Sequence, residues 1–199
     1  GIFTGNPLLR TVVVAEEEFD TTEHSTTDLN GHGTGVAGIV VYGDFHDSIQ
    51  SRTFTPLVRI CNGKIMHDDN GNPLFPEDVR PEKIVKDAIT YFHDTYGCRI
   101  FNLSAGNCES IYQGGRQFPW ASMLDDLSRE LDIVIIVSAG NVSNPLINDF
   151  SSRDELMQKS RDQLFDPEHR LIDPATSALS ITVGSITRCA EPALPRGAM

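Results

Sequence analysis

Residues 81–103 read PEKIVKDAITYFHDTYGCRIFNL, and this stretch decides the fold class. From 81 to 96 the apolar residues recur on one face of a helix, with Pro81 in the first turn and Gly97 as the stop. A strand pattern follows at 99–103, after only two residues. The spacing therefore predicts a helix over 81–96 that leads directly into a strand.

The alternation of helix and strand continues on both sides of this stretch. Trp120, Leu124 and Leu127 repeat at helical spacing, and the aliphatic run IVIIV at 133–137 is typical of a parallel strand covered on both faces. This order predicts an α/β fold with an open parallel sheet and helices on both faces. Further strand patterns lie at 11–15, 56–61 and 179–186, a short helix of small residues at 33–42, and a hairpin tip at 69–71.

Two polar stretches interrupt this pattern. Residues 16–30 predict a surface loop, and the segment between Asn141 and Asp173 is polar, with a helix pattern at 153–165. We interpret 142–173 as an insertion within one domain that spans 1–199. A surface decoration and a segment that covers a site or docks a regulatory partner both fit this insertion.

The bulk composition limits the class of protein. With 199 residues, of which 39% are hydrophobic and 22% charged, the chain can bury one sizeable core. Its net charge of −12 argues against non-specific binding to nucleic acid or to an anionic membrane, because both need a basic surface. No apolar run approaches the roughly 20 residues that cross a bilayer. We therefore expect no nucleic acid and no membrane among the partners.

The cysteines and acidic clusters give weak signals. Cys61, Cys98, Cys108 and Cys189 are widely spaced and form no CxxC pair, which predicts reduced thiols in a cytoplasmic rather than a secreted protein. The clusters at 44–47 and 67–69 invite a metal hypothesis, but Pro73 occupies the position where a calcium loop needs glycine. The residues by themselves therefore predict no cofactor and no metal site.

The sharpest chemical signal is NGHGTGVAG at 30–38, which places His32 at the mouth of a glycine-rich helix start. A general base must present its imidazole edge to a nucleophile, and flanking glycines let backbone and substrate approach. A lone histidine among glycines is more often a capping or turn residue. The full string, however, resembles the histidine motif of the subtilase family, which implies that His32 is the catalytic base.

Two later segments resemble the same family in order and spacing. FNLSAG at 101–106 is similar to the strand that lines the specificity pocket and pairs with an extended substrate, which implies substrate binding by Ser104, Ala105 and Gly106. IIVSAGN at 135–141 looks like the strand end that carries the oxyanion asparagine, which implies this role for Asn141. An isolated Ala-Gly-Asn is usually an ordinary turn, but its position after the other two motifs favours the functional interpretation.

The chain also departs from the family pattern. Gly1-Ile2 match the residues that follow the family's Asp-(Ser or Thr)-Gly turn, so the catalytic aspartate is expected two positions before Gly1. The nucleophile motif Gly-Thr-Ser-Met-Ala does not occur within the 199 residues. Asp20 and Asp28 are candidate replacements for the aspartate, but loop carboxylates are the favoured interpretation of both. We thus expect a subtilisin-like domain truncated at both ends and inactive by itself.

The resemblance implies a serine endopeptidase as the parent protein, with a polypeptide as its substrate. Calcium is common in the family and is the one metal that the resemblance leaves to consider. A different class of function remains open, namely a subtilase-like scaffold or peptide-binding domain that keeps the groove without the chemistry. Sequence outside these 199 residues would decide between the two.

Overall fold

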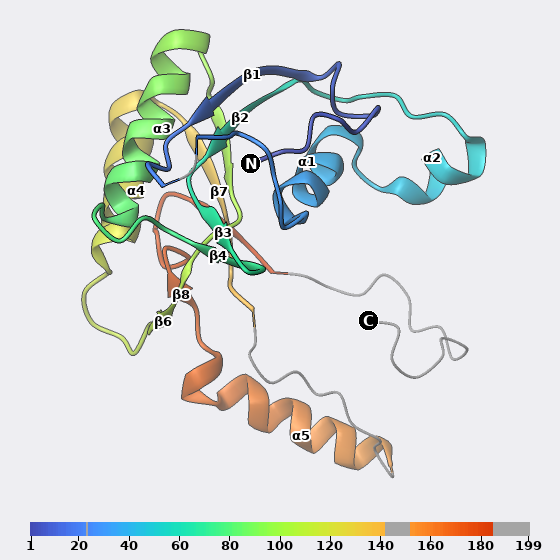
Figure 1. The fold of residues 1–199 in the computed structure, drawn as a ribbon. Helices are drawn as coiled ribbons and strands as arrows, with labels where there is room; N and C mark the ends of the chain where they lie inside the picture. Colours follow the sequence, from blue (N-terminus) through green and yellow to red (C-terminus); the bar gives the residue numbers. More distant parts are fainter. Residues whose placement is uncertain (23, 142–151, 185–199) are drawn as a thin grey trace.

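The computed structural model describes residues 1–22, 24–141 and 152–184, and its strands form two separate parallel sheets and two antiparallel pairs (Figure 1). The parallel sheets have the orders β1 (Val13–Glu18)–β2 (Ile60–Lys64) and β5 (Ile100–Leu103)–β7 (Val134–Ser138)–β9 (Ile181–Val183). The antiparallel pairs are β3 (His67–Asp69) with β4 (Asn72–Leu74) and β6 (Asn107–Ile111) with β8 (Ile172–Asp173). The helices are α1 (His32–Tyr42), α2 (Phe45–Ser51), α3 (Pro81–Tyr96), α4 (Pro119–Leu131), α5 (Arg153–Phe165) and the 3-10 helix η1 (Pro167–His169).

The main core lies where α3 and α4 pack against β5 and β7. Leu124 of α4 and Ile135 of β7 are fully buried there, and Trp120 meets Phe75 edge to face with ring centroids 5.6 Å apart. The predicted helix over 81–96 is confirmed at both ends, and Gly97 ends it with a positive φ of 68°. The amphipathic spacing predicts these helices well because each buries a single continuous apolar face against the strands.

A second, smaller core lies under α1, around Leu9, Val12, Val41 and Tyr42. The Tyr42 hydroxyl donates to the Leu8 carbonyl oxygen at 2.6 Å, which satisfies the one polar side chain among the buried residues of this helix. Together with α3 and α4 on the other side of the strands, α1 gives the predicted arrangement of parallel strands with helices on both faces (Figure 1).

Several sequence predictions of strand bounds and burial are wrong. β1 continues to Glu18 instead of ending at 15, because Glu16 and its two successors pair with β2, and the Asn62 amide donates to Glu16 at 3.1 Å. β2 begins at Ile60 rather than 56, and α2 had no sequence signal that we recognised. Within the described residues the run at 133–137 is not covered along the whole of both faces, since Val134 remains 42% exposed.

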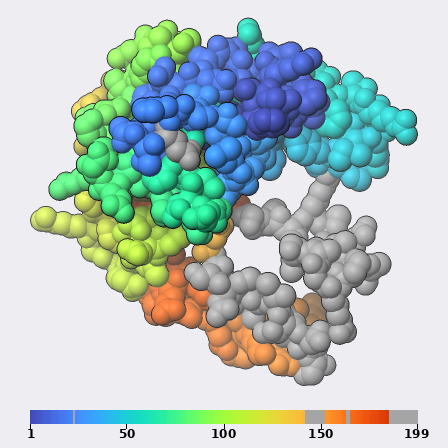
Figure 2. All heavy atoms as spheres, in the orientation of Figure 1, coloured from blue at the N-terminus to red at the C-terminus, as the bar shows by residue number. Residues whose placement is uncertain are grey.

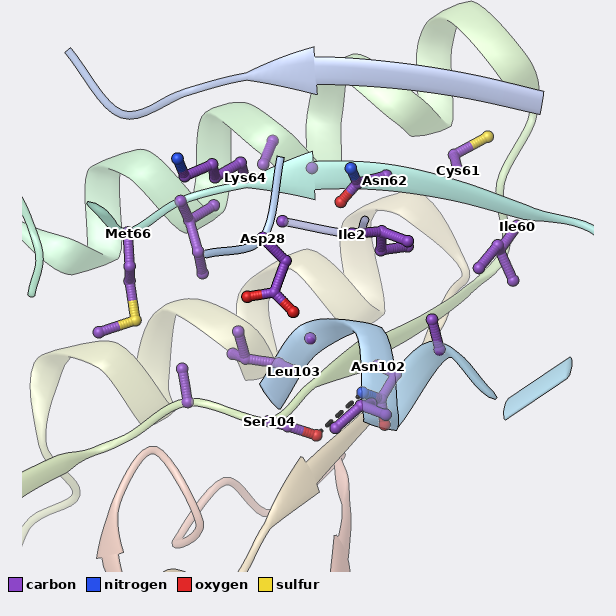
Figure 3. Close-up of a pocket in the computed structure, with 18 of the residues that line it drawn as sticks. Ile2, Asp28, Ile60, Cys61, Asn62, Lys64, Met66, Asn102, Leu103 and Ser104 are labelled. Atoms are coloured by element: carbon purple, nitrogen blue, oxygen red, sulfur yellow. Dashed lines mark hydrogen bonds between the residues drawn. The ribbon is translucent and has the colours of Figure 1, made fainter. Parts of the chain in front are cut away.

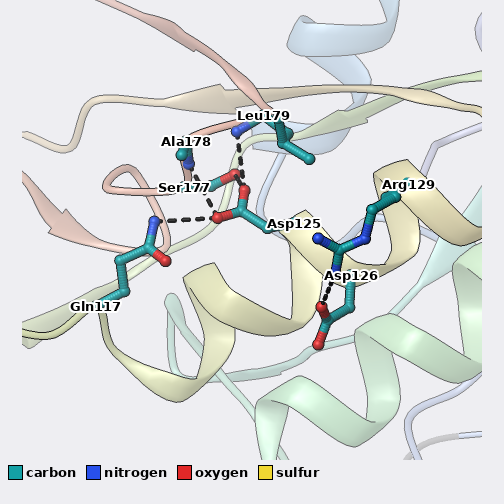
Figure 4. Close-up of polar contacts among 7 residues, drawn as sticks. All are labelled: Gln117, Asp125, Asp126, Arg129, Ser177, Ala178 and Leu179. Atoms are coloured by element: carbon teal, nitrogen blue, oxygen red, sulfur yellow. Dashed lines mark hydrogen bonds and ion pairs between the residues drawn. The ribbon is translucent and has the colours of Figure 1, made fainter.

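The segment before β9 is attached to α4 by hydrogen bonds. The Asp125 carboxylate accepts from the backbone N–H groups of Ala178 and Leu179 and from the Ser177 hydroxyl (Figure 4). From β8, the Asp173 carboxylate accepts from the Ala121 N–H at 3.0 Å and so caps the first turn of α4. These tertiary contacts place the end of β7 and the strand β9 beside each other.

The predicted insertion contains the expected helix, α5, which covers 153–165 and extends away from the sheets (Figures 1 and 2). Residues 142–151 and 185–186 of the predicted insertion and last strand lie outside the described residues. The described part of the chain has no helix with the length and apolar character that a membrane span requires.

Candidate active site

A cavity of about 450 Å³ separates the two parallel sheets. β2 and β5 line its two sides, α1 covers one face and α3 the other (Figure 3). Among the described strands β2 pairs only with β1, and β5 only with β7, so the two strand edges that face the cavity have no strand partner. Predicted site residues His32, Ser104 and Ala105 all belong to its lining.

Asp28 organises the helix start that carries His32. One of its carboxylate oxygens accepts from the N–H groups of Asn30 and Gly31, and the other accepts from the N–H and the hydroxyl of Thr34, at 2.8 and 2.6 Å. Burial alone would raise the pKa of Asp28, but the hydrogen bonds from Thr34 and Gly31 outweigh it and hold the pKa below its ordinary value. Asp28 is therefore an anionic cap of α1.

The backbone around His32 is fixed by two further contacts. The Asn30 amide donates to the Gly71 carbonyl oxygen at 2.9 Å and so connects the histidine loop to the β3–β4 hairpin. Gly33 lies against the backbone of Gly1, where a Cβ atom would come within 2.1 Å of the carbonyl oxygen, whereas a Cβ at Gly35 would meet nothing. Close packing therefore requires glycine at position 33 but not at position 35.

The exposed ring of His32 lies next to the end of β5. Its Nε2 atom is 3.3 Å from the Ser104 carbonyl oxygen. Because a carbonyl oxygen only accepts, Nε2 carries the proton in this contact, and the tautomer is the opposite of the one in which Nε2 acts as a base. A carboxylate at Nδ1 would hold the proton on that nitrogen and leave Nε2 free to accept another.

The two Ser-Ala-Gly segments lie side by side at the carboxyl edge of the sheet. Ile172 of β8 packs against both Gly106 and Gly140, and a Cβ on either glycine would come within 2.9 Å of its side chain. Asn141 follows Gly140 and is exposed at this same edge, although it does not line the cavity. Residues 104–106 join no strand, and the Ser104 carbonyl accepts from His32.

In the described residues neither candidate replacement for the triad aspartate forms a hydrogen bond or ion pair with His32. Asp28 caps α1, and Asp20 pairs with a second histidine, His67. No signal in the sequence indicates that these two residues meet. The Nδ1 atom of His67 lies 2.9 Å from an oxygen of the buried Asp20 side chain. Close His–Asp pairs in the described residues thus include His67 with Asp20 and His93 with Asp94, but not His32.

The acidic clusters weighed as metal sites serve local structure. Asp44 caps α2 by accepting from the His46 N–H, and Asp68 accepts from the Gly71 N–H at the hairpin tip. Across the described residues, no three His, Cys, Asp or Glu side chains gather in a group that could hold a metal ion.

Three comparisons place the chain among known proteins. The model of the subtilase family matches residues 3–196. The uncharacterized protein y4bN of Sinorhizobium fredii is 39% identical over 104 residues, which make up 52% of this chain and 23% of that protein. The structure of the prenylagaramide maturation protease PagA matches with a TM-score of 0.53 and 20% identity, over 94% of this chain and 52% of that one.

These two relatives are longer, and the chain spans about half of one and a quarter of the other. The likeness to PagA shows a shared fold, and the family match extends over nearly all of the sequence that carries the three motifs. On this match, together with the parallel α/β architecture, the chain belongs to the subtilase family.

Proposed function

We propose that the protein containing these residues hydrolyses peptide bonds as a serine-type endopeptidase, with His32 as the general base and Asn141 as the oxyanion donor. The observation that supports this most directly is the position of His32, at the head of α1 with its ring against the end of β5. A subtilase motif and an open cavity thus coincide at one place in the fold.

The remaining groups of the mechanism would come from sequence outside residues 1–199. In the proposed reaction a serine hydroxyl attacks the peptide carbonyl carbon, and its proton passes to His32. The oxyanion then accepts a hydrogen bond from the Asn141 side-chain amide, and His32 protonates the leaving amine. Water cleaves the resulting ester by the same steps in reverse. A carboxylate at His32 Nδ1 would supply the tautomer that the contact with Ser104 lacks.

Residues 104–106 continue from β5 and pair with no described strand, which suggests how the substrate is held. An extended polypeptide adds to such an edge as a further strand, so that backbone hydrogen bonds provide affinity whatever the side chains. We therefore infer that unstructured polypeptide is the substrate class. The same edge would also serve a peptide-binding domain that cleaves nothing, which is the competing function.

The test uses the full-length protein with unfolded casein as the substrate. We expect cleavage that a serine-directed sulfonyl fluoride abolishes, and no cleavage by residues 1–199 alone. Asn141→Ala should lower kcat by about 100- to 1,000-fold and change KM little. This magnitude is the one known for the oxyanion asparagine of subtilisin itself. Binding of casein without any cleavage by the full-length protein would establish the scaffold function instead.

A further inference from the structure

Two cysteines that are far apart in the sequence meet at one end of the cavity. Cys61 is the second residue of β2, and Cys98 lies in the turn between α3 and β5. Their sulfur atoms are 3.8 Å apart although the residues are separated by 37 positions. Both thiols are half-buried, and both belong to the cavity lining.

We propose that Cys61 and Cys98 are a reversible disulfide site that, on oxidation, covalently joins the β1–β2 sheet to the β5–β7–β9 sheet. The two sheets share no hydrogen-bonded strand pair among the described residues, and the pair of thiols bridges them directly. The site does not depend on the proposed peptidase activity.

The geometry favours closure of the bond. A disulfide has a sulfur–sulfur distance of about 2 Å, so each sulfur must move by about 1 Å, a shift that rotation about the Cα–Cβ bonds can provide. Cys98 follows Gly97, the left-handed residue that ends α3, and therefore sits in a turn rather than within a regular element. By contrast, Cys108 is exposed on β6, and it provides an internal reference thiol.

The reaction requires an oxidant, for which we name a low-molecular-weight disulfide such as oxidised glutathione. A thiolate of the pair attacks this disulfide and releases one glutathione thiol. The second cysteine then attacks the mixed disulfide, which forms the protein bond and releases the second glutathione thiol. Burial, and then the contact with Cys98, raise the pKa of the Cys61 thiol to about 11, so the reaction should accelerate as the pH rises.

The position of the pair predicts what the bond does. Cys61 and Cys98 lie at the amino-terminal ends of β2 and β5, whereas His32 contacts Ser104 just beyond the carboxyl-terminal end of β5. Figure 3 shows Cys61 and Ser104 at opposite ends of the cavity. The bond would therefore fix the two sheets relative to each other without covering His32. It would also close a long loop, which restricts the unfolded chain and stabilises the folded state.

The test exploits the cleavage pattern of trypsin, which separates the cysteines onto different peptides. Cys61 falls in 60–64, Cys98 in 87–99, Cys108 in 100–116 and Cys189 in 189–196. The folded protein is incubated with oxidised glutathione, blocked with N-ethylmaleimide and digested. We expect peptides 60–64 and 87–99 to be recovered joined, about 2 Da lighter than the sum of the two, and to separate on reduction.

Matched variants complete the test. Cys108→Ser should keep the joined peptide, whereas Cys61→Ser and Cys98→Ser should lose it. Oxidation should raise Tm by about 5 °C or more in the wild type and in Cys108→Ser but not in Cys61→Ser. The proposal is overturned if 60–64 and 87–99 both carry maleimide after oxidation while 100–116 carries glutathione. It is equally overturned if the joined peptide forms only in denaturant. Both outcomes are read on the wild type and need no variant to fold.

Discussion

His32 and His67 line the same cavity, but their rings are held in opposite ways. His67 is largely buried and fixed by the carboxylate of Asp20, at 2.9 Å. His32 is exposed and contacts a backbone carbonyl at 3.3 Å. The histidine with the better-defined geometry is thus not the one in the subtilase motif.

The difference shows what each arrangement can do. The ring of His67 belongs to the β3–β4 hairpin and is held by a buried carboxylate, so it contributes to stability and has little freedom to meet a substrate. An exposed ring at a helix start can receive a proton from a nucleophile, provided that another group fixes its tautomer. Asp20 pairs with His67, and Asp28 accepts hydrogen bonds from the first turn of α1, so neither acid orients the His32 ring.

The largest expected effect separates the two histidines by activity. In the full-length protein, His32→Ala should reduce peptide hydrolysis by at least about 1,000-fold and leave the fold intact, because the ring is exposed. His67→Ala should retain most of the turnover. Because this variant should be less stable, it is assayed well below its Tm. Casein hydrolysis and circular dichroism measure the two properties. Normal turnover by folded His32→Ala would reverse the assignment.

The next effect concerns the stability of the His67 pair. Asp20→Ala should destabilise the folded state by about 2–3 kcal/mol, because it removes the partner of His67 and the acceptor of the Thr22 N–H. The free energy of unfolding in urea measures this loss. The exposed Asp78 is a matched control, for which Asp78→Ala should change stability by less than about 0.5 kcal/mol. Equal effects of the two substitutions would show that the His67 pair is not structural.

A smaller effect is expected from Asp28→Asn, which keeps the shape of the side chain but removes an acceptor from the start of α1. Because the Asp28 carboxylate is partly exposed, we expect a loss of about 1–2 kcal/mol in the free energy of unfolding. The pKa of Asp28 is lowered in the folded state, so its contribution to stability is present above the ordinary pKa and is lost as the pH falls through the folded value. Thermal midpoints of wild type and variant should therefore differ at pH 7 and converge below about pH 4. A difference that persists in acid would show that charge is not the cause.

The smallest effect tests the packing around His32. Gly35→Ala should stabilise the protein by about 0.5–1 kcal/mol, because the position is helical and a Cβ there meets nothing. The matched Gly33→Ala should destabilise it, since its Cβ would come within 2.1 Å of the Gly1 carbonyl oxygen. Thermal unfolding of the two variants compares them directly. Destabilisation by both would mean that the helix tolerates no side chain at either position.

Local signals explain why much of the fold could be predicted. α3, α4 and α5 follow from residue spacing, and the hairpin of β3 and β4 follows from Asn70-Gly71, whose positive φ angles of 54° and 90° suit a tight two-residue turn. The second half of β1 could not be predicted, because its glutamates are satisfied by Asn62, Ser25 and Tyr91 from other parts of the chain. The antiparallel pairing of β6 with β8 could not be predicted either, because the two strands lie far apart in the sequence.

The sequence by itself determined α1, α3, α4 and α5, the parallel α/β class and the family, since periodicity and motifs are read within short windows. Only the tertiary structure decided which groups meet. It brought Cys61 to Cys98, Asp20 to His67 and His32 to Ser104, and it assigned Asp28 to the backbone of α1 rather than to a catalytic ring. The physical reason is that hydrogen bonds and thiol contacts act over a few ångströms in space, and the spacing of residues along a chain does not reveal which side chains will share that space.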